Sequence, residues 1–175
     1  MKPVRSLGLA LAALALLAGC GKPGDSAPQA AAVGATSASA TAEQLRFTAK
    51  TVDGKDFSGE SLAGKPAVLW FWAPWCPSCN REAPTITKLA AESKGVAWVG
   101  VAAQDQLPAM QAFVAKYDMG GFPHIADLDA SVWQRFGVSA QPAFAFIDGS
   151  GKADVIIGSP TEDDIRARVA KLTGG

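Results

Sequence analysis

Apolar runs and amphipathic stretches alternate along the chain from about residue 43 onward, and this alternation predicts strands and helices in turn. Two runs, 67–72 and 96–102, contain only apolar residues and glycine, which indicates buried strands. The patterning predicts helices at 77–93, 108–117 and 131–136, and a last helix that ends at Leu172. We therefore expect an α/β domain with helices packed against a central sheet.

Shorter patterns predict the remaining strands. Leu45 to Val52 and the Asp53-Gly54 turn suggest a β-hairpin that leads into the domain. A second hairpin is expected from strands 143–147 and 153–157, which flank Asp148-Gly149-Ser150-Gly151. A short strand is also expected at 125–128. Because hairpins pair antiparallel and strand–helix–strand units pair parallel, the sheet should be mixed.

Several prolines lie at or near the predicted helices. Pro108 suits the first turn of its helix, whereas Pro84 lies inside the helix at 77–93 and should kink it. Ser159-Pro160-Thr161-Glu162 fits a capping box for the last helix, with Pro160 at the first helical position.

The first 42 residues are typical of an export signal followed by a linker, and not of a folded domain. Lys2 and Arg5 precede an apolar stretch from Leu7 to Ala18, which is too short for an ordinary membrane span and fits a signal peptide at 1–19. Leu17-Ala18-Gly19-Cys20 resembles a bacterial lipobox, and the resemblance implies cleavage before Cys20 and a lipid on its sulfur. The alternative is an ordinary secreted protein with a chance cysteine.

The segment that follows differs in composition from the rest. Residues 23–42 are mostly Ala, Gly, Ser, Thr and Pro, with no aromatic residue, so 20–42 is predicted to be a disordered tether. The folded domain is expected at 43–175. A lipid on Cys20 would hold it at the extracytoplasmic face of the cell envelope, anchored to a membrane. The chain has 16 basic and 16 acidic side chains, so no net positive field is available to recruit nucleic acid.

The chemistry is concentrated in Trp75-Cys76-Pro77-Ser78-Cys79, which follows directly on the strand at 67–72. A strand that turns into a helix there places Cys76 at the helix N-terminus, where free N–H groups and the helix dipole stabilise a thiolate. Cys79 follows three residues later and faces Cys76 across one turn. This spacing predicts thiol–disulfide exchange, with Cys76 exposed and Cys79 buried.

Other interpretations of the two cysteines are weaker. A structural disulfide would close a very short loop and would constrain the unfolded chain little. A zinc site needs about four ligands, and besides these thiols the chain offers a single histidine, His124. We interpret His124 as a strand-edge residue without a catalytic role, and Asp127 and Asp129 as a solvated turn rather than a metal pair. No metal and no cofactor are expected.

The order of these motifs resembles the thioredoxin fold over nearly all of residues 43–172. The stretch from Val68 through Pro84, followed by Gln141-Pro142-Ala143-Phe144, is similar to exported members of the TlpA/DsbE-like branch, and to secreted DsbE/DsbF-type oxidoreductases in particular. The resemblance implies that Cys76 is the nucleophile and Cys79 the resolving cysteine. It also implies that Trp75 flanks the site and that Pro142 is a cis-proline, which exposes the backbone of Gln141 to a substrate strand.

The chain departs from the pattern of the proteins it resembles at two positions. Thioredoxin has a buried acid six residues before the first cysteine, where this chain has Trp70. Glu82 matches an acid common in the TlpA-like branch and is expected to act as a base or to tune the thiols; alternatively it is an exposed carboxylate near the helix N-terminus. Pro142-Ala143 replaces the Pro-Glu pair of cytochrome c maturation members and argues against that role.

These observations predict an exported thiol:disulfide oxidoreductase, and the resemblance to exported oxidising members implies that it introduces disulfides into exported proteins. Its partners would be protein thiols or disulfides and a membrane redox protein that recycles it, and the protein would be a monomer. The alternatives are a reductase fed by a membrane electron donor and a thioredoxin-fold metallochaperone, although copper-carrying relatives typically have a wider cysteine spacing and a late histidine. Peroxidase activity is disfavoured, because Ala73 replaces the threonine that peroxiredoxins need.

Overall fold

A five-stranded mixed sheet forms the centre of the computed structural model, which describes residues 43–174. The predicted signal peptide, tether and Cys20 lie outside the described residues. The strand order is β5 (His124–Ala126), β4 (Ala97–Ala102), β3 (Ala67–Trp72), β6 (Ala143–Ile147) and β7 (Ala153–Ile157). The three strands β3, β4 and β5 are parallel, and β6 and β7 are antiparallel to their neighbours. The predicted mixed sheet is confirmed.

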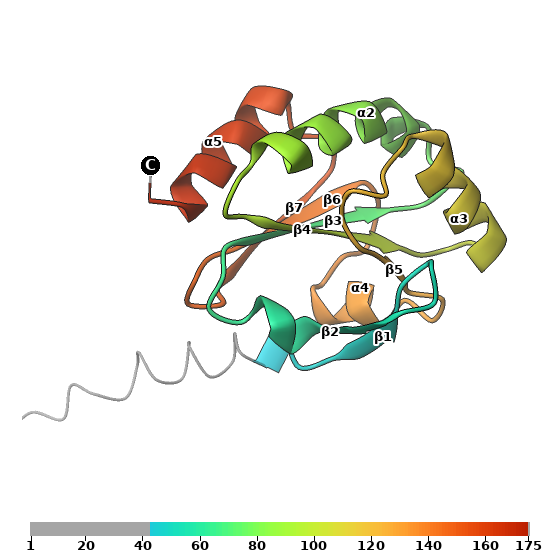
Figure 1. Ribbon diagram of the computed structural model, residues 1–175, viewed down its shortest axis with the longest axis horizontal. Coiled ribbons are helices and arrows are strands. Elements are labelled where there is room, and N and C mark those ends of the chain that lie inside the picture. The colour runs from blue at the N-terminus through green and yellow to red at the C-terminus, as the bar shows by residue number, and fades with distance from the viewer. Residues whose placement is uncertain (1–42, 175) are drawn as a thin grey trace, which may run out of the picture. The chain divides into compact units, whose positions relative to one another are not determined.

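Helices cover both faces of this sheet (Figure 1). One face carries α2 (Pro77–Glu92), α3 (Leu107–Lys116) and α5 (Glu162–Leu172). The other face carries α4 (Ser131–Arg135), the 3₁₀ turn η1 (Gly59–Leu62) and a small antiparallel hairpin of β1 (Thr48–Lys50) and β2 (Asp56–Ser58). No helix of residues 43–174 is both long and apolar enough to cross a bilayer.

The central strand β3 divides the core into two apolar clusters. Side chains alternate across a strand: Val68, Trp70 and Trp72 pack under the three-helix face, whereas Leu69 and Phe71 pack with α4 and η1. Every residue of β3 is buried, as expected for a central strand with both faces covered.

Strand directions bring four loops to one edge of the sheet. The parallel strands β3, β4 and β5 all end at this edge, and the antiparallel strand β6 begins there, because Trp72 pairs with Ala102 and Phe71 with Ala143. The segments at 73–76, 103–106, 127–130 and 141–142 therefore gather at the same edge, where α2 also starts.

The predicted elements are largely confirmed, with differences at boundaries. The strands at 67–72, 143–147 and 153–157 have the predicted bounds, whereas β5 covers 124–126 rather than 125–128. The first hairpin is present, but its first strand is only three residues long. Helix α2 continues through Pro84.

The predicted cap of the last helix is wrong. Thr161, not Ser159, is the N-cap of α5, and its capping box is formed with Asp164; Pro160 lies before the helix. The Thr161 hydroxyl accepts from the backbone of Asp164, and the Asp164 carboxylate accepts from the backbone of Thr161. Glu162, the acid of the predicted box, instead pairs with Lys88 and Arg166.

Candidate active site

Cys76 is the N-cap residue of α2, as the sequence predicted. Its backbone is extended, its N–H donates to the Ala73 carbonyl at 3.1 Å, and its Sγ accepts from the backbone N–H of Cys79 at 3.3 Å. Both cysteines are free thiols. The sulfur of Cys76 thus lies where the unpaired N–H groups of the first helical turn point.

Cys76 is much less exposed than the sequence predicted. Cys76 is 4% exposed and Cys79 is fully buried. Both belong to the apolar cluster that also contains Trp72 and Ala73, so the loop between strand and helix packs over the first thiol as well as the second. Cys76 is still the more accessible of the two.

The buried Cys79 is held as a neutral thiol. Burial raises its pKa most, the neighbouring Cys76 raises it further, and the charge of Glu82 adds a smaller increase in the same direction. A backbone hydrogen bond to Ala73 partly opposes the shift. The two thiols therefore differ, since only Cys76 lies at the helix terminus.

Glu82 is half-buried, and the interpretation of this residue as an exposed carboxylate is wrong. Its Oε2 accepts from the indole Nε1 of Trp70 at 3.3 Å, and its Oε1 is buried without a hydrogen bond of regular geometry. Burial raises the pKa of this carboxyl, and the Ser159 hydroxyl, Trp70 and the charge of Arg81 oppose the shift. Glu82 is thus a carboxyl in a partly apolar environment, close enough to Cys79 to act on its ionisation.

The Gln141–Pro142 peptide bond is cis, as the resemblance implied. Pro142 is buried directly before β6, and its carbonyl accepts from the backbone N–H of Gly158 at 2.8 Å. Gln141 is partly exposed. The strand pairing places both residues at the same edge of the sheet as the start of α2.

Trp75 stands out at this edge because its side chain is 54% exposed. Its indole Nε1 donates to the backbone carbonyl of Gln104 at 3.0 Å. Gln104 has a φ of 62°, a conformation that only a few per cent of residues other than glycine adopt. This loop residue was not singled out from the sequence, and no local pattern reveals that its carbonyl orients Trp75.

The remaining candidates have structural roles. His124 is buried, its Nε2 lies 3.0 Å from the Met119 carbonyl, and burial lowers its pKa to about 4, so it is neutral. Asp127 is buried rather than solvated, and its two oxygens accept from the backbone N–H groups of Val132 and Trp133 at the start of α4. Within residues 43–174, no group of three or more potential side-chain ligands is placed to hold a metal ion.

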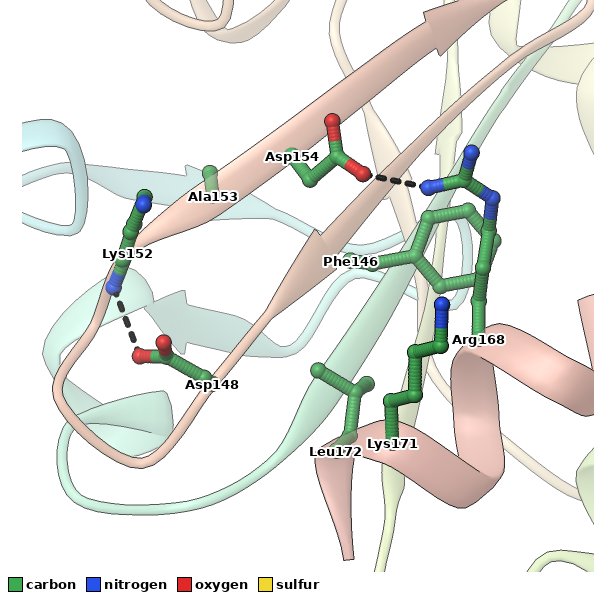
Figure 2. Close-up of a pocket in the computed structure, with 8 residues that line it drawn as sticks. All are labelled: Phe146, Asp148, Lys152, Ala153, Asp154, Arg168, Lys171 and Leu172. Carbon is green, nitrogen blue, oxygen red and sulfur yellow. Dashed lines mark hydrogen bonds and ion pairs between the residues drawn. The ribbon is translucent and has the colours of Figure 1, made fainter.

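A surface cavity of about 350 Å³ lies near the end of β6, where Phe146 and Asp148 line it (Figure 2). Since β6 begins next to Pro142, this cavity lies at the end of the sheet away from the cysteines. Phe146 forms part of its wall, and the guanidinium of Arg168 lies 5.4 Å from the centre of that ring while pairing with Asp154. No cysteine lines this cavity, so it is separate from the thiol chemistry.

A mixed sheet with a Cys-x-x-Cys at the start of a helix and a cis-proline before an adjacent strand defines a thioredoxin-fold oxidoreductase. Comparison with known proteins agrees. The Redoxin family model matches residues 22–172. The secreted antigen MPT53 of Mycobacterium tuberculosis is 46% identical over 135 residues, which are 75% of this chain and 77% of the antigen. The thiol-disulfide oxidoreductase ResA of Bacillus cereus is 30% identical over 75% of this chain and 77% of its own.

Solved structures support the same assignment. The structure of MTB dsbF in mixed oxidised and reduced forms is 56% identical, with a TM-score of 0.72 over 74% of this chain and 96% of its own. A secreted M. tuberculosis disulfide oxidoreductase, described as homologous to E. coli DsbE, is 44% identical with a TM-score of 0.71 over 74% and 98% of the two chains. The chain belongs to the Redoxin family and is a thiol:disulfide oxidoreductase.

Proposed function

We propose that this protein introduces disulfide bonds into exported proteins, with Cys76 as the exchanging thiol and Cys79 as the resolving thiol. The observation that carries the proposal is the asymmetry of the pair. Cys76 accepts an N–H at the N-terminus of α2, whereas Cys79 is fully buried with a raised pKa. Attack through the more accessible Cys76 leaves Cys79 free to close or reopen the bond within the protein.

In the oxidising direction, a substrate thiolate attacks Sγ of Cys76 in the oxidised protein. The Cys76–Cys79 bond breaks, and Cys79 leaves with the electron pair and takes up a proton. A second substrate thiolate then attacks the substrate sulfur of the mixed disulfide, and Cys76 leaves as a thiolate. The substrate loses two electrons and the protein gains them, so a membrane redox partner must reoxidise the dithiol.

The other site residues have distinct parts in this proposal. The raised pKa of the Glu82 carboxyl suits a group that passes a proton to or from Cys79. Trp75 offers an exposed apolar surface beside the thiols, and Pro142 lies against the disulfide while the backbone of Gln141 pairs with an extended substrate segment. Trp75→Ala should therefore raise the Michaelis constant for a reduced protein substrate more than that for a small dithiol such as dithiothreitol.

Direction depends on how strongly the reduced state is stabilised. Only the reduced protein carries a thiolate, so its stabilisation at the helix N-terminus makes the protein more oxidising. The carboxyl of Glu82 opposes this, because its charge disfavours a nearby thiolate. We expect the helix to dominate and the potential to be clearly less negative than thioredoxin's value of about −270 mV.

The test is an equilibrium titration of the Cys76–Cys79 pair in glutathione buffers, together with oxidative refolding of a reduced, unfolded substrate. A less negative potential with fast refolding supports the oxidase. A potential at or below about −270 mV with fast reduction of disulfide substrates would instead establish the reductase fed by a membrane electron donor.

We also propose that the exported protein is held at a membrane by a lipid on Cys20, with a signal peptide at 1–19, a tether at 20–42 and the domain at 43–175. The lipobox resemblance supports this proposal. The native protein should partition into detergent, and Cys20→Ser should release it in soluble form. Mass spectrometry that finds unmodified Cys20 in the mature protein would reject the anchor.

A further inference from the structure

The side-chain amide of Asn80 bridges the loop that carries Cys76 and the end of α3. Its Nδ2 donates to the backbone carbonyls of Pro74 and Cys76, each at 2.9 Å. Its Oδ1 accepts from the Tyr117 hydroxyl at 2.7 Å and from the Lys116 ammonium at 3.3 Å. An asparagine amide has two N–H donors and two lone pairs on oxygen, so the hydrogen-bonding capacity of Asn80 is fully used.

These partners fix which way the amide points. Tyr117 and Lys116 supply hydrogens to the oxygen side, so the N–H side must face the two loop carbonyls. A rotated amide would place Oδ1 against those carbonyls and Nδ2 against the Lys116 ammonium, so three of the four bonds would be lost and only the Tyr117 hydroxyl could turn to accept. Lys116 is exposed, whereas the Tyr117 ring packs 4.8 Å from Phe113, which in turn stacks on Trp72 at 4.3 Å. Tyr117 is therefore the partner anchored in the core.

The bridge acts on the part of the loop that sets the position of the reactive sulfur. Pro74 and Cys76 flank Trp75, so Asn80 ties down both ends of a three-residue segment. The Cys76 carbonyl also accepts from the backbone N–H of Asn80 at 3.1 Å, so Asn80 holds this carbonyl with both its backbone and its side chain. With this backbone held, Sγ of Cys76 remains within 3.3 Å of the N–H of Cys79.

We propose that Asn80 is a positioning residue that keeps Cys76 at the N-terminus of α2, and that Tyr117 acts through it. Its use in catalysis rests on the proposed exchange function, but its effect on thiol reactivity does not. The bridge was not foreseen from the sequence, because Tyr117 is 37 residues from Asn80 and only the fold brings them together.

The test is the rate at which iodoacetamide alkylates Cys76 in the reduced full-length protein, measured across pH by peptide mass spectrometry. A helix N-terminus favours a nearby negative charge by a factor of roughly two to five. Asn80→Ala should therefore slow alkylation at pH 6 by about threefold and move the midpoint of the pH–rate profile upward. Tyr117→Phe should change both in the same direction, but less.

A double variant tests whether Tyr117 acts on Cys76 through Asn80. If Tyr117 works through Asn80, then Asn80→Ala with Tyr117→Phe should alkylate no more slowly than Asn80→Ala alone. Gln111→Ala is the matched control, because Gln111 on α3 also donates an amide N–H to a backbone carbonyl, that of Val52 at 2.7 Å. This control should lower stability and leave the pH–rate profile in place.

Two results would overturn the proposal: an unchanged pH–rate profile in Asn80→Ala, or fully additive effects of the two substitutions. The wild-type protein is assayed in parallel for exchange with a protein substrate. If it does not exchange but Asn80→Ala still shifts the alkylation profile, the proposed function fails and the positioning role stands. If exchange is normal and the profile does not move, only the positioning role fails.

Discussion

Replacing Glu82 with glutamine tests how strongly a carboxyl acts on the thiols. The substitution keeps the shape of the side chain and an oxygen to accept from Trp70, but removes the charge. Glu82 follows Cys79 by three residues on α2, so the two side chains leave the same helix face. Loss of the charge should stabilise a thiolate in the reduced protein and make the Cys76–Cys79 pair more oxidising.

The magnitude follows from helix geometry. The thiolate that sets the potential is on Cys76, six residues before Glu82, and a rise of about 1.5 Å per residue puts the two charges roughly 9–10 Å apart. At this separation they interact by roughly 2 kcal/mol at an effective dielectric constant of 20. Glu82 is only partly buried, and solvent screening reduces this to about 1 kcal/mol. For a two-electron couple, about 1 kcal/mol corresponds to a rise of roughly 20 mV.

The assay is the potential of wild type and Glu82→Gln in glutathione buffers at several pH values. Burial raises the pKa of Glu82, so protonation removes its charge at a higher pH than for an exposed glutamate. The two potentials should differ above this pKa and converge below it, where both side chains are neutral. A constant difference at all pH values would show a packing effect, and no difference at any pH would refute the electrostatic argument.

Three further predictions follow from the buried groups. Cys76 should be alkylated before Cys79 in the reduced protein, and Cys79→Ser should trap substrates as mixed disulfides through Cys76; preferential labelling of Cys79 would contradict both roles. Asp127→Ala should lower the free energy of unfolding by about 2 kcal/mol, because it leaves two buried N–H groups at the start of α4 without an acceptor. Denaturant titration with unchanged thiol reactivity would confirm a structural role, whereas altered reactivity would refute it. Gly100→Ala should cost about 1–3 kcal/mol, because an added Cβ would meet the His124 ring and lie 2.9 Å from Trp72 Nε1; wild-type stability in the same titration would contradict this packing.

Most of the fold could be predicted because its elements are locally encoded. The run at 67–72 is entirely apolar, and a strand covered on both faces needs that composition. The turn at 148–151 places Asp148 where its carboxylate accepts from the backbone of Ser150 and Lys152, which closes the hairpin locally. Cys76 at the start of α2 follows from the same logic, since strand and helix meet at the motif.

The errors concern residues whose surroundings come from distant parts of the chain. The exposure of Cys76 depends on how four loops pack at one edge of the sheet, and no local pattern encodes that packing. Asp127 is the exception, because it is buried by a local contact: its carboxylate accepts from the backbone N–H groups of Val132 and Trp133 at the start of α4. Asn80 and Gln104 were missed because each acts on the site through a partner far away in sequence.

Trp70 stands where thioredoxin has a buried acid, so β3 itself supplies no carboxyl to the thiols. In the structure the indole N–H of Trp70 holds Glu82 from the neighbouring helix, and the Glu82 charge contributes to the raised pKa of Cys79. A carboxyl therefore acts on the buried thiol, and it is supplied by α2 rather than β3.

Trp70→Phe should remove the hydrogen bond to Glu82. The Glu82 carboxyl would then lose one of the groups that lower its pKa, and the potential should move toward that of Glu82→Gln near neutral pH. If Trp70→Phe instead lowers the potential, Trp70 does not act through Glu82, and the two residues influence the thiols separately.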